Sequence, residues 1–148
     1  MITKKRTERF TNQKKAVLDY LKSVKTHPTA EVVYFEVRKK LPQISLGTVY
    51  RILKNLSEKK QIITIPAEIS HFDADISPHA HYICRKCNNV FDIFNACKDC
   101  RILKEKKLKV GKIENYQIYF YGICRKCSKK IMPRLSKRNK NRKQRKDS

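Results

Sequence analysis

Six cysteines constrain this chain more than any other feature, because they fall into three Cys-x-x-Cys pairs: Cys84 and Cys87, Cys97 and Cys100, and Cys124 and Cys127. The first and third pairs are near copies, since each has the sequence Ile-Cys-Arg-Lys-Cys. Two such pairs are a common way to build a tetrahedral zinc site with four thiolate ligands. The Arg-Lys between the cysteines fits, because nearby cations offset the negative charge of four thiolates. The spacing therefore predicts a structural Zn²⁺ site made by Cys84, Cys87, Cys124 and Cys127.

Disulfide chemistry is the alternative use of these pairs. The basic start, Met1 to Arg6, leads into polar residues, so no secretion signal is predicted. No apolar run approaches the roughly 20 residues that a membrane span needs. We therefore expect a cytoplasmic protein with no membrane partner, a setting in which disulfide frameworks are rare. A thiol oxidoreductase would need one reactive pair in a βαβ setting, and the sequence pattern does not contain that setting.

The middle pair has a different context. A Lys-rich helix is predicted from Cys97 to Lys109, and cysteines three residues apart on a helix share a face. Three interpretations of Cys97 and Cys100 stay open at this point. They are two ordinary thiols, a secondary redox switch, or an alternative pair of zinc ligands.

Helical periodicity dominates the chain from Thr11 to about Lys60. Thr11 is predicted to cap a first helix that ends at His27-Pro28, and Thr29 is predicted to cap a second helix that ends at Pro42. Ser45 is predicted to cap a third helix. Its apolar residues have the i, i+3, i+4, i+7 spacing of a single buried face: Val49, Ile52, Leu53 and Leu56.

The opposite face of the third predicted helix is polar. Arg51 and Lys54 point away from the apolar stripe, and Tyr50 and Asn55 flank it. Three short helices followed by two short strands, at 61–65 and 71–73, fit a winged helix-turn-helix unit that binds DNA. The residues that we expect to contact DNA are Ser45, Thr48, Tyr50, Arg51, Lys54 and Asn55. An ordinary helical bundle is the alternative.

Net charge favours a nucleic-acid partner. The chain has 36 Lys and Arg against 13 Asp and Glu, a formal charge of +23 at pH 7. Clustered cations bind phosphates with release of counterions. Ten of the cations and a single Asp follow Cys127, so residues 131–148 are predicted to be a basic tail without fixed structure. The alternative is a surface that is merely basic and soluble.

The pattern changes near His79. Strands are predicted at 79–84, 89–94 and 116–123, and with the Lys-rich helix they make an α/β module of roughly 50 residues. A module that small needs a metal ion or a partner subunit for stability.

A second set of metal ligands surrounds the first cysteine pair. Because residues i and i+2 of a strand face one side, His79 and His81 can present both imidazoles to one ion. Asp73 and Asp92 lie on either side of them in the sequence, and His27 lies at the start of the second predicted helix. Mixed nitrogen and oxygen ligands suit Fe²⁺, Mn²⁺ or Zn²⁺. Taken singly, His27 would be a helix-entry residue, and the two Asp residues would be surface or turn carboxylates.

The order of these motifs resembles that of the ferric uptake regulator family. The resemblance covers about residues 6–130, and the motifs are Thr48-Val49-Tyr50-Arg51, Phe72-Asp73, H-x-H-x-x-C-x-x-C from His79 to Cys87, and Cys124-x-x-Cys127. It implies an α+β protein with an N-terminal winged helix-turn-helix domain and a small α/β dimerisation domain. The implied ranges are 1–74 for the DNA-binding domain, 75–78 for a hinge, 79–130 for the dimerisation domain and 131–148 for the tail.

The resemblance also implies roles for the ligands. The four cysteines of the first and third pairs would bind structural Zn²⁺, and a regulatory Fe²⁺ or Mn²⁺ would be bound by His27, Asp73, His79, His81 and Asp92. Tyr50 and Arg51 would lie in the helix that reads DNA. The implied function is a metal-dependent transcriptional regulator, a homodimer that represses when metal occupies the regulatory site.

The sensed signal follows from the last ligand. Many iron-sensing members have Glu where this chain has Asp92, and a set of only His and Asp is similar to that of the peroxide-responsive repressor branch. There, peroxide oxidises a ligand histidine at the Fe²⁺ site, and metal and DNA are released. An iron, manganese or zinc sensor of the same family is the alternative, and a basic zinc-ribbon protein that binds RNA is a more distant one. We expect no enzyme, because the sequence lacks a nucleophile–base constellation.

Overall fold

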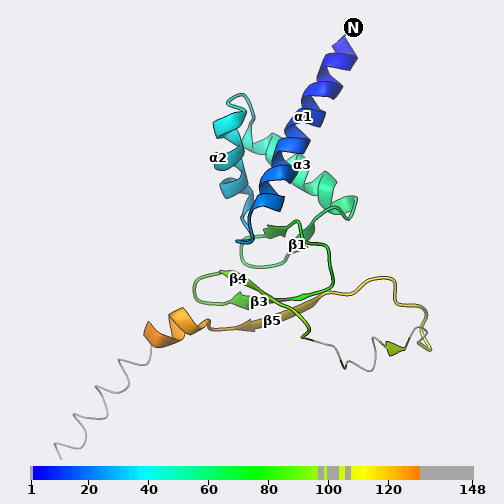
Figure 1. The fold of residues 1–148 in the computed structure, drawn as a ribbon, viewed down its shortest axis with the longest axis vertical. Helices are drawn as coiled ribbons and strands as arrows, with labels where there is room; N and C mark the ends of the chain where they lie inside the picture. The colour runs from blue at the N-terminus through cyan, green and yellow to red at the C-terminus, as the bar shows by residue number, and fades with distance from the viewer. Residues whose placement is uncertain (1, 97–98, 100–103, 106–107, 131–148) are drawn as a thin grey trace, which may run out of the picture.

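The structure is a computed structural model that describes residues 2–96, 99, 104–105 and 108–130. Three helices come first: α1 (Ile2–Ser23), α2 (Ala30–Lys40) and α3 (Leu46–Glu58). Five strands follow: β1 (Ile63–Ile65), β2 (His71–Asp73), β3 (Ala80–Cys84), β4 (Val90–Ile93) and β5 (Ile118–Gly122). Figure 1 shows the helices at one end of the molecule, the β3–β4–β5 sheet at the other end, and β1 between them. The predicted α+β class is confirmed.

The second and third helices begin where the sequence predicts. Thr29 is the N-cap residue of α2, and α2 ends at Lys40, before Pro42. The Ser45 side chain caps α3 by accepting a hydrogen bond from the backbone N–H of Thr48, at 3.1 Å. The predicted apolar stripe of α3 is buried in a core that α1 and α2 complete: Val49, Ile52, Leu53, Leu56, Val17, Leu21, Val33 and Val37. Burial of each large aliphatic side chain contributes about 1.5–3 kcal/mol.

The start of α1 differs from the prediction. The helix begins at Ile2 rather than at Thr11, which lies within it. Residues 2–10 have no apolar stripe to mark them as helical, but they are rich in Lys, Arg and Glu, which favour helix on intrinsic propensity.

The helix predicted over 97–109 lies largely outside the described residues, as do Cys97, Cys100 and the tail 131–148. Its predicted end is wrong, because Leu108 pairs with Gly111 in an antiparallel bridge. Gly111 has φ +144°, a conformation that favours glycine and that turns the chain back on itself here.

Two sheets are formed, as the predicted strands require. Strands β1 and β2 make an antiparallel hairpin, and a three-stranded sheet has the order β4–β3–β5. Strand β4 is antiparallel to β3, whereas β5 is parallel to it, with Gly122 opposite Cys84. The parallel register matters for the site, because β3 and β5 both end at the same edge of the sheet.

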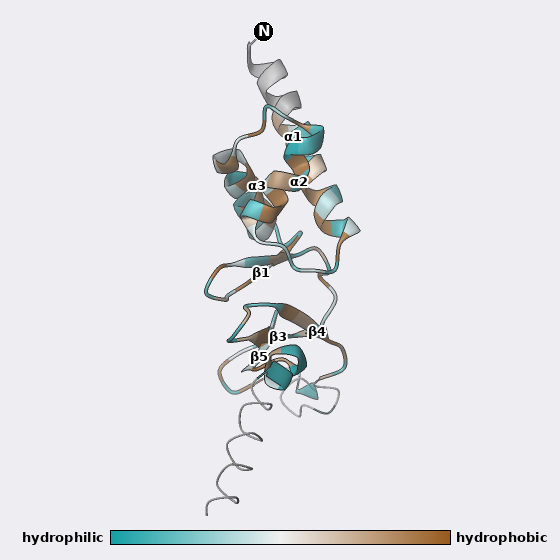
Figure 2. Cartoon of the chain, turned by 90° about the vertical axis from the view of Figure 1, so that its left-hand side faces the viewer, coloured by the Kyte–Doolittle hydropathy of each residue, from teal (hydrophilic) through white to brown (hydrophobic). Residues whose placement is uncertain are grey.

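The β1–β2 hairpin packs against both halves of the molecule. Ile62 and Phe72 belong to the helical core, while Ile65 is buried with Ile83 and Val90 of the sheet. In Figure 2 hydrophobic and hydrophilic colours alternate along the helices, and hydrophobic colour covers much of β3 and β4. No helix among the described residues is long and apolar enough to cross a membrane.

Candidate metal centres

Four thiols meet at the edge where β3 and β5 end. The Sγ atoms of Cys84, Cys87, Cys124 and Cys127 all lie within 4.8 Å of one another. The Cys87 and Cys124 sulfurs are 3.8 Å apart. A regular tetrahedron with Zn–S bonds of about 2.3 Å has S–S edges of about 3.8 Å. The four cysteines predicted from the repeated motif therefore lie close enough together for one tetrahedral zinc ion, and the Cys87–Cys124 distance equals the edge of that tetrahedron.

Backbone geometry prepares the thiols as ligands. The Cys124 N–H donates to Cys84 Sγ at 3.3 Å. This hydrogen bond, with smaller contributions from the N–H groups of Cys87 and Lys86, lowers the pKa of the Cys84 thiol to about 6. Burial raises the pKa of Cys127 to about 12. One thiolate is therefore available near neutral pH in the metal-free protein, and binding of a cation releases the remaining protons.

A second cluster lies between the helical half and the sheet. It contains the Nε2 atoms of His27, His79 and His81 and one oxygen each of Asp73 and Asp92, all within 4.8 Å of one another. His81 and Asp92 are opposite each other in the β3–β4 register. All five residues predicted as regulatory metal ligands are thus brought together.

The cluster joins two groups of elements. His27 lies three residues before Ala30, the first residue of α2, and Asp73 ends β2, whereas the other three residues lie on β3, on β4 or next to β3. The shortest separation between the groups is 2.7 Å, from His27 Nε2 to Asp92 Oδ1. The three imidazoles are at most 2 % exposed, while the Asp92 side chain is 18 % exposed. Solvent therefore reaches the cluster from the carboxylate side.

Neighbouring groups orient two of the ligands. The His79 Nδ1–H donates to the Ser77 carbonyl at 2.7 Å, which leaves the lone pair of Nε2 directed into the cluster. Asp73 Oδ1 accepts the Asp75 N–H at 2.8 Å, so its other oxygen faces the imidazoles. Such contacts fix the tautomer and direction of metal ligands.

The cluster fits a divalent cation better than it fits a hydrogen-bond network. His27 Nε2 and Asp92 Oδ1 are both buried, and neither has a hydrogen-bond partner in the part of the chain that the structure describes. Their 2.7 Å separation does not have hydrogen-bond geometry. Buried polar atoms without a partner are costly, and a cation at the centre of three imidazoles and two carboxylates would satisfy both of them.

Protonation in this cluster favours a negative carboxylate. Burial works to raise the pKa of Asp73, but the His27 and His81 imidazoles and the Asp75 N–H outweigh it and hold that pKa far below its usual range. Burial works to lower the pKa of His27, but the two carboxylates outweigh it and raise that pKa. A proton on His27 therefore competes with a cation for the same lone pair.

The residues predicted to contact DNA lie along α3. Tyr50, Arg51 and Lys54 are exposed. The Tyr50 hydroxyl donates to Glu31 of α2 at 2.5 Å, and the Arg51 guanidinium lies 4.8 Å from the centre of the Phe10 ring of α1.

Of the remaining three residues of this set, Ser45 is exposed and Thr48 is half-buried. The hydroxyls of Ser45 and Thr48 are 2.9 Å apart within the α3 cap. Asn55 is half-buried, and among the described residues its Oδ1 has no partner. Contact of all six residues with DNA stays a prediction.

Three residues that orient the ligands were missed by sequence analysis: His71, Asp75 and Ser77. The Asp-x-Asp-x-Ser spacing from Asp73 to Ser77 is typical of consecutive turns in which a side chain accepts the N–H two residues on, and the structure forms both. His71 belongs to no local pattern that would have marked it.

The sequence of the chain is similar to those of known proteins of one family. The family model described as "Ferric uptake regulator family" matches residues 5–121. The peroxide operon regulator of Bacillus subtilis (strain 168) is 32% identical over 124 residues, which cover 82% of this chain and 86% of that protein. The peroxide-responsive repressor PerR of Staphylococcus epidermidis is 30% identical over 122 residues, 80% of this chain and 81% of that protein.

Solved structures agree with the sequence comparison. The Campylobacter jejuni peroxide stress regulator has a TM-score of 0.72 and 28% identity, and the match covers 85% of this chain and 96% of that chain. The Helicobacter pylori ferric uptake regulator Fur shares the fold, with a TM-score of 0.66 and 20% identity over 86% of this chain and 91% of that one. The resemblance inferred from the motifs is confirmed: the chain is a member of the ferric uptake regulator family.

Proposed function

We propose that this chain is a metal-dependent transcriptional repressor that binds operator DNA as a homodimer and releases it in response to peroxide. The observation that carries the proposal is the buried cluster of three imidazoles and two carboxylates between the helical half and the sheet. Relatives named as peroxide regulators support the choice of signal. In this role residues 1–74 bind DNA, residues 75–78 form a hinge and residues 79–130 dimerise, and the chain has no catalytic activity.

The five ligands come from both halves of the molecule. His27 and Asp73 are held by the helical half and the hairpin, while His79, His81 and Asp92 are held by the sheet. A bound Fe²⁺ or Mn²⁺ would link the two groups of ligands, and Fe²⁺ would also supply redox chemistry toward peroxide. With the groups linked, α3 keeps a fixed direction relative to the sheet.

A fixed direction of α3 matters in a dimer. Two recognition helices engage two half-sites only when their separation matches roughly one turn of DNA, about 34–36 Å. If one ligand histidine is oxidised, its lone pair is lost and the two halves are no longer linked. The population then shifts toward arrangements whose helix spacing does not fit the operator.

Metal-level sensing is the second candidate. The cluster combines imidazole and carboxylate ligands, which accept Fe²⁺, Mn²⁺ and Zn²⁺. A sensor of iron, manganese or zinc would use the same linkage between the halves, but its histidines would stay intact in peroxide. An RNA-binding zinc ribbon is less well supported, because it would use neither the polar face of α3 nor the histidine cluster.

Mass spectrometry separates the two candidates. The zinc-bound protein is loaded anaerobically with Fe²⁺ and given a small excess of peroxide, and a matched sample is loaded with Mn²⁺. We expect one added oxygen on the peptide with His27 or on the peptide with His79 and His81, in the Fe²⁺ sample alone. Intact histidines with tightly held metal would instead indicate a metal-level sensor, and failure to bind a second metal would refute the switch.

Sequence readout by α3 is tested with an Arg51→Ala variant. We expect it to lose about 1–3 kcal/mol of operator affinity and much of its preference for operator over unrelated duplex DNA. Truncation after Lys130 is the matched comparison, because it removes cations of the tail and leaves α3 intact. It is expected to lower the dependence of binding on salt with little change in preference. Fluorescence anisotropy at several salt concentrations measures both, and equal preference in the Arg51 variant and the parent would contradict the assignment.

A further inference from the structure

We propose that His71, the histidine outside the ligand cluster, is a positioning residue that holds His27 and Asp73 together as one preassembled pair of metal ligands. This inference rests on the proposed function of the cluster as a regulatory metal site. The chain has four histidines. Three of them belong to the ligand cluster, and the remaining one, His71, contacts the backbone of His27.

The contact is a short hydrogen bond across the molecule. His71 Nδ1 lies 2.5 Å from the backbone carbonyl oxygen of His27. A carbonyl oxygen can only accept, so Nδ1 of His71 must carry the proton. A backbone interaction flanks this bond: Thr29 pairs with His71 in an antiparallel bridge, to which the 3.0 Å hydrogen bond from the Phe72 N–H to the Pro28 carbonyl belongs. The segment 27–29 is thereby fastened to β2.

The backbone of His27 needs this support. His27 has φ +50°, in the left-handed region, which costs a residue with a side chain about 1–2 kcal/mol. Removal of the His71 donor would leave the His27 carbonyl without this partner in a half-buried place. The turn could then relax to a more favourable φ, and such a change would move the imidazole away from its 2.7 Å approach to Asp92.

The same strand supplies the second ligand. Asp73 follows His71 by two residues on β2, and its Oδ2 lies 3.6 Å from His27 Nε2. One hydrogen bond and its flanking bridge therefore set the position of both ligands of the helical half. When the metal is lost, this pair would then move as one unit relative to the group of His79, His81 and Asp92. The positions of His27 and Asp73 relative to each other would not change.

Three substitutions separate the donor of His71 from its bulk. His71→Phe keeps a ring and removes the donor, and His71→Asn places an amide N–H near the position of Nδ1. His71→Gln places that N–H farther out, near the position of Nε2. Mn²⁺ affinity of the full zinc-bound chain is measured by competition with a chromophoric chelator. We expect a 10–100-fold loss for His71→Phe and His71→Gln, typical of lost outer-shell contacts to metal ligands, and near-parental affinity for His71→Asn.

A second readout uses the protein without Mn²⁺. The Phe72 amide is bonded to the Pro28 carbonyl, so its hydrogen exchange reports on the attachment of segment 27–29. Exchange is expected to be faster in His71→Phe than in the parent or in His71→Asn. The matched control is Ser57→Ala, which removes the 2.9 Å bond between Thr64 and Ser57 from the α3 side and leaves the hairpin sequence unchanged. It should alter neither Mn²⁺ affinity nor exchange at Phe72.

The outcomes distinguish this inference from the proposed function. Parental Mn²⁺ affinity in His71→Phe would overturn the positioning role. An equal loss in all three variants would also overturn it, because the imidazole would then act by packing alone. Absence of Mn²⁺ binding in the parent would refute the proposed regulatory site, while slower exchange at Phe72 in the parent than in His71→Phe would still support the fastening of the turn.

Discussion

A Cys124→Ser variant is expected to lose its bound zinc and, with it, the folded β3–β4–β5 sheet. Strand β5 contacts the rest of the sheet only through β3 among the described strands, and the core beneath it is small: Ile65, Ile83 and Val90. Binding of structural zinc contributes about 10–16 kcal/mol in peptides of comparable simplicity, more than so small a core supplies. Zinc content per chain and thermal unfolding followed by circular dichroism measure the loss.

The control is a double Cys97→Ser and Cys100→Ser variant. It removes two thiols, the number in one Cys-x-x-Cys pair, and leaves the four proposed zinc ligands unchanged. Unchanged zinc content and unchanged response to peroxide would identify these residues as ordinary thiols. Loss of zinc would assign them to the metal, and loss of the peroxide response alone would assign them to a redox switch. Stoichiometric zinc in the Cys124→Ser variant would contradict the proposed four-cysteine site.

At a Mn²⁺ concentration that just fills the site of the parent, an Asp92→Ala variant is expected to bind operator DNA as weakly as it does without Mn²⁺. Asp92 Oδ1 makes the closest approach between the two groups of ligands, 2.7 Å from His27 Nε2. Loss of this ligand should reduce Mn²⁺ affinity by roughly 100-fold or more, since loss of a mere outer-shell contact costs 10–100-fold. Isothermal titration with Mn²⁺ and anisotropy with labelled operator measure the two effects.

Asp99→Ala is the matched control for this variant. It removes the same charge from a side chain that is 96 % exposed and whose ion-pair partner is Lys104. Its Mn²⁺ affinity and operator affinity should equal those of the parent. If the Mn²⁺ concentration that just fills the parent site still strengthened operator binding by Asp92→Ala, the cluster would not be the regulatory site.

Local signals in the sequence were sufficient for much of the fold. The Ser45 cap and the apolar stripe from Val49 to Leu56 fixed the start and the buried face of α3, because both act within four residues along the chain. The start of α1 was missed for the opposite reason. Its first turns are helical by propensity alone, which is a weak signal beside a cap or an apolar stripe.

The two sets of metal ligands could be predicted from the sequence, but the contacts that hold the ligands in position could not. The spacing of the histidines, two apart on a strand, and of the cysteines, in repeated pairs, predicts that they bind metal. The opposition of His81 and Asp92 follows from a hairpin that the first cysteine pair closes, so its register could have been inferred. The left-handed backbone of His27 and its bond to His71 join residues 44 positions apart, and no local pattern encodes such a contact.

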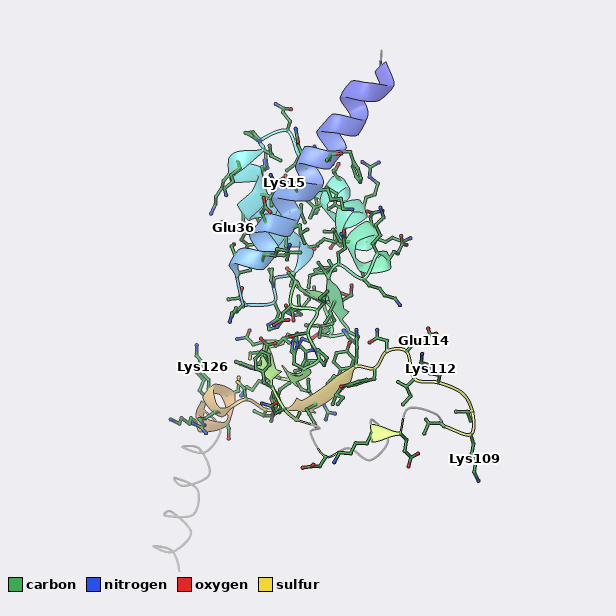
Figure 3. All side chains as sticks on the ribbon, turned by 45° about the vertical axis from the view of Figure 1, so that its right-hand side comes forward. Lys15, Glu36, Lys109, Lys112, Glu114 and Lys126 are labelled. Carbon is green, nitrogen blue, oxygen red and sulfur yellow. The ribbon has the colours of Figure 1, made fainter. Side chains whose placement is uncertain are left out.

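The basic side chains are spread over distinct parts of the molecule. Figure 3 shows Lys15 on α1, Lys109 and Lys112 on the connection between β4 and β5, and Lys126 on the helical turn that follows β5. Only some of these cations can face one DNA duplex at the same time. The salt dependence of binding should therefore report fewer phosphate contacts than the net charge of +23 alone would suggest.

The parallel pairing of β3 with β5 has a consequence for how this chain can vary. The connection 94–117 leads from one edge strand to the other, yet the register of β5 is set by the metal-binding pairs at the strand ends. A cross-link of that kind leaves the length of the intervening chain almost free, since doubling a flexible loop costs only about 0.6 kcal/mol. Residues 108–115 of this connection are therefore the natural place for insertions, and a foreign peptide or a reporter domain grafted there should leave both metal centres intact.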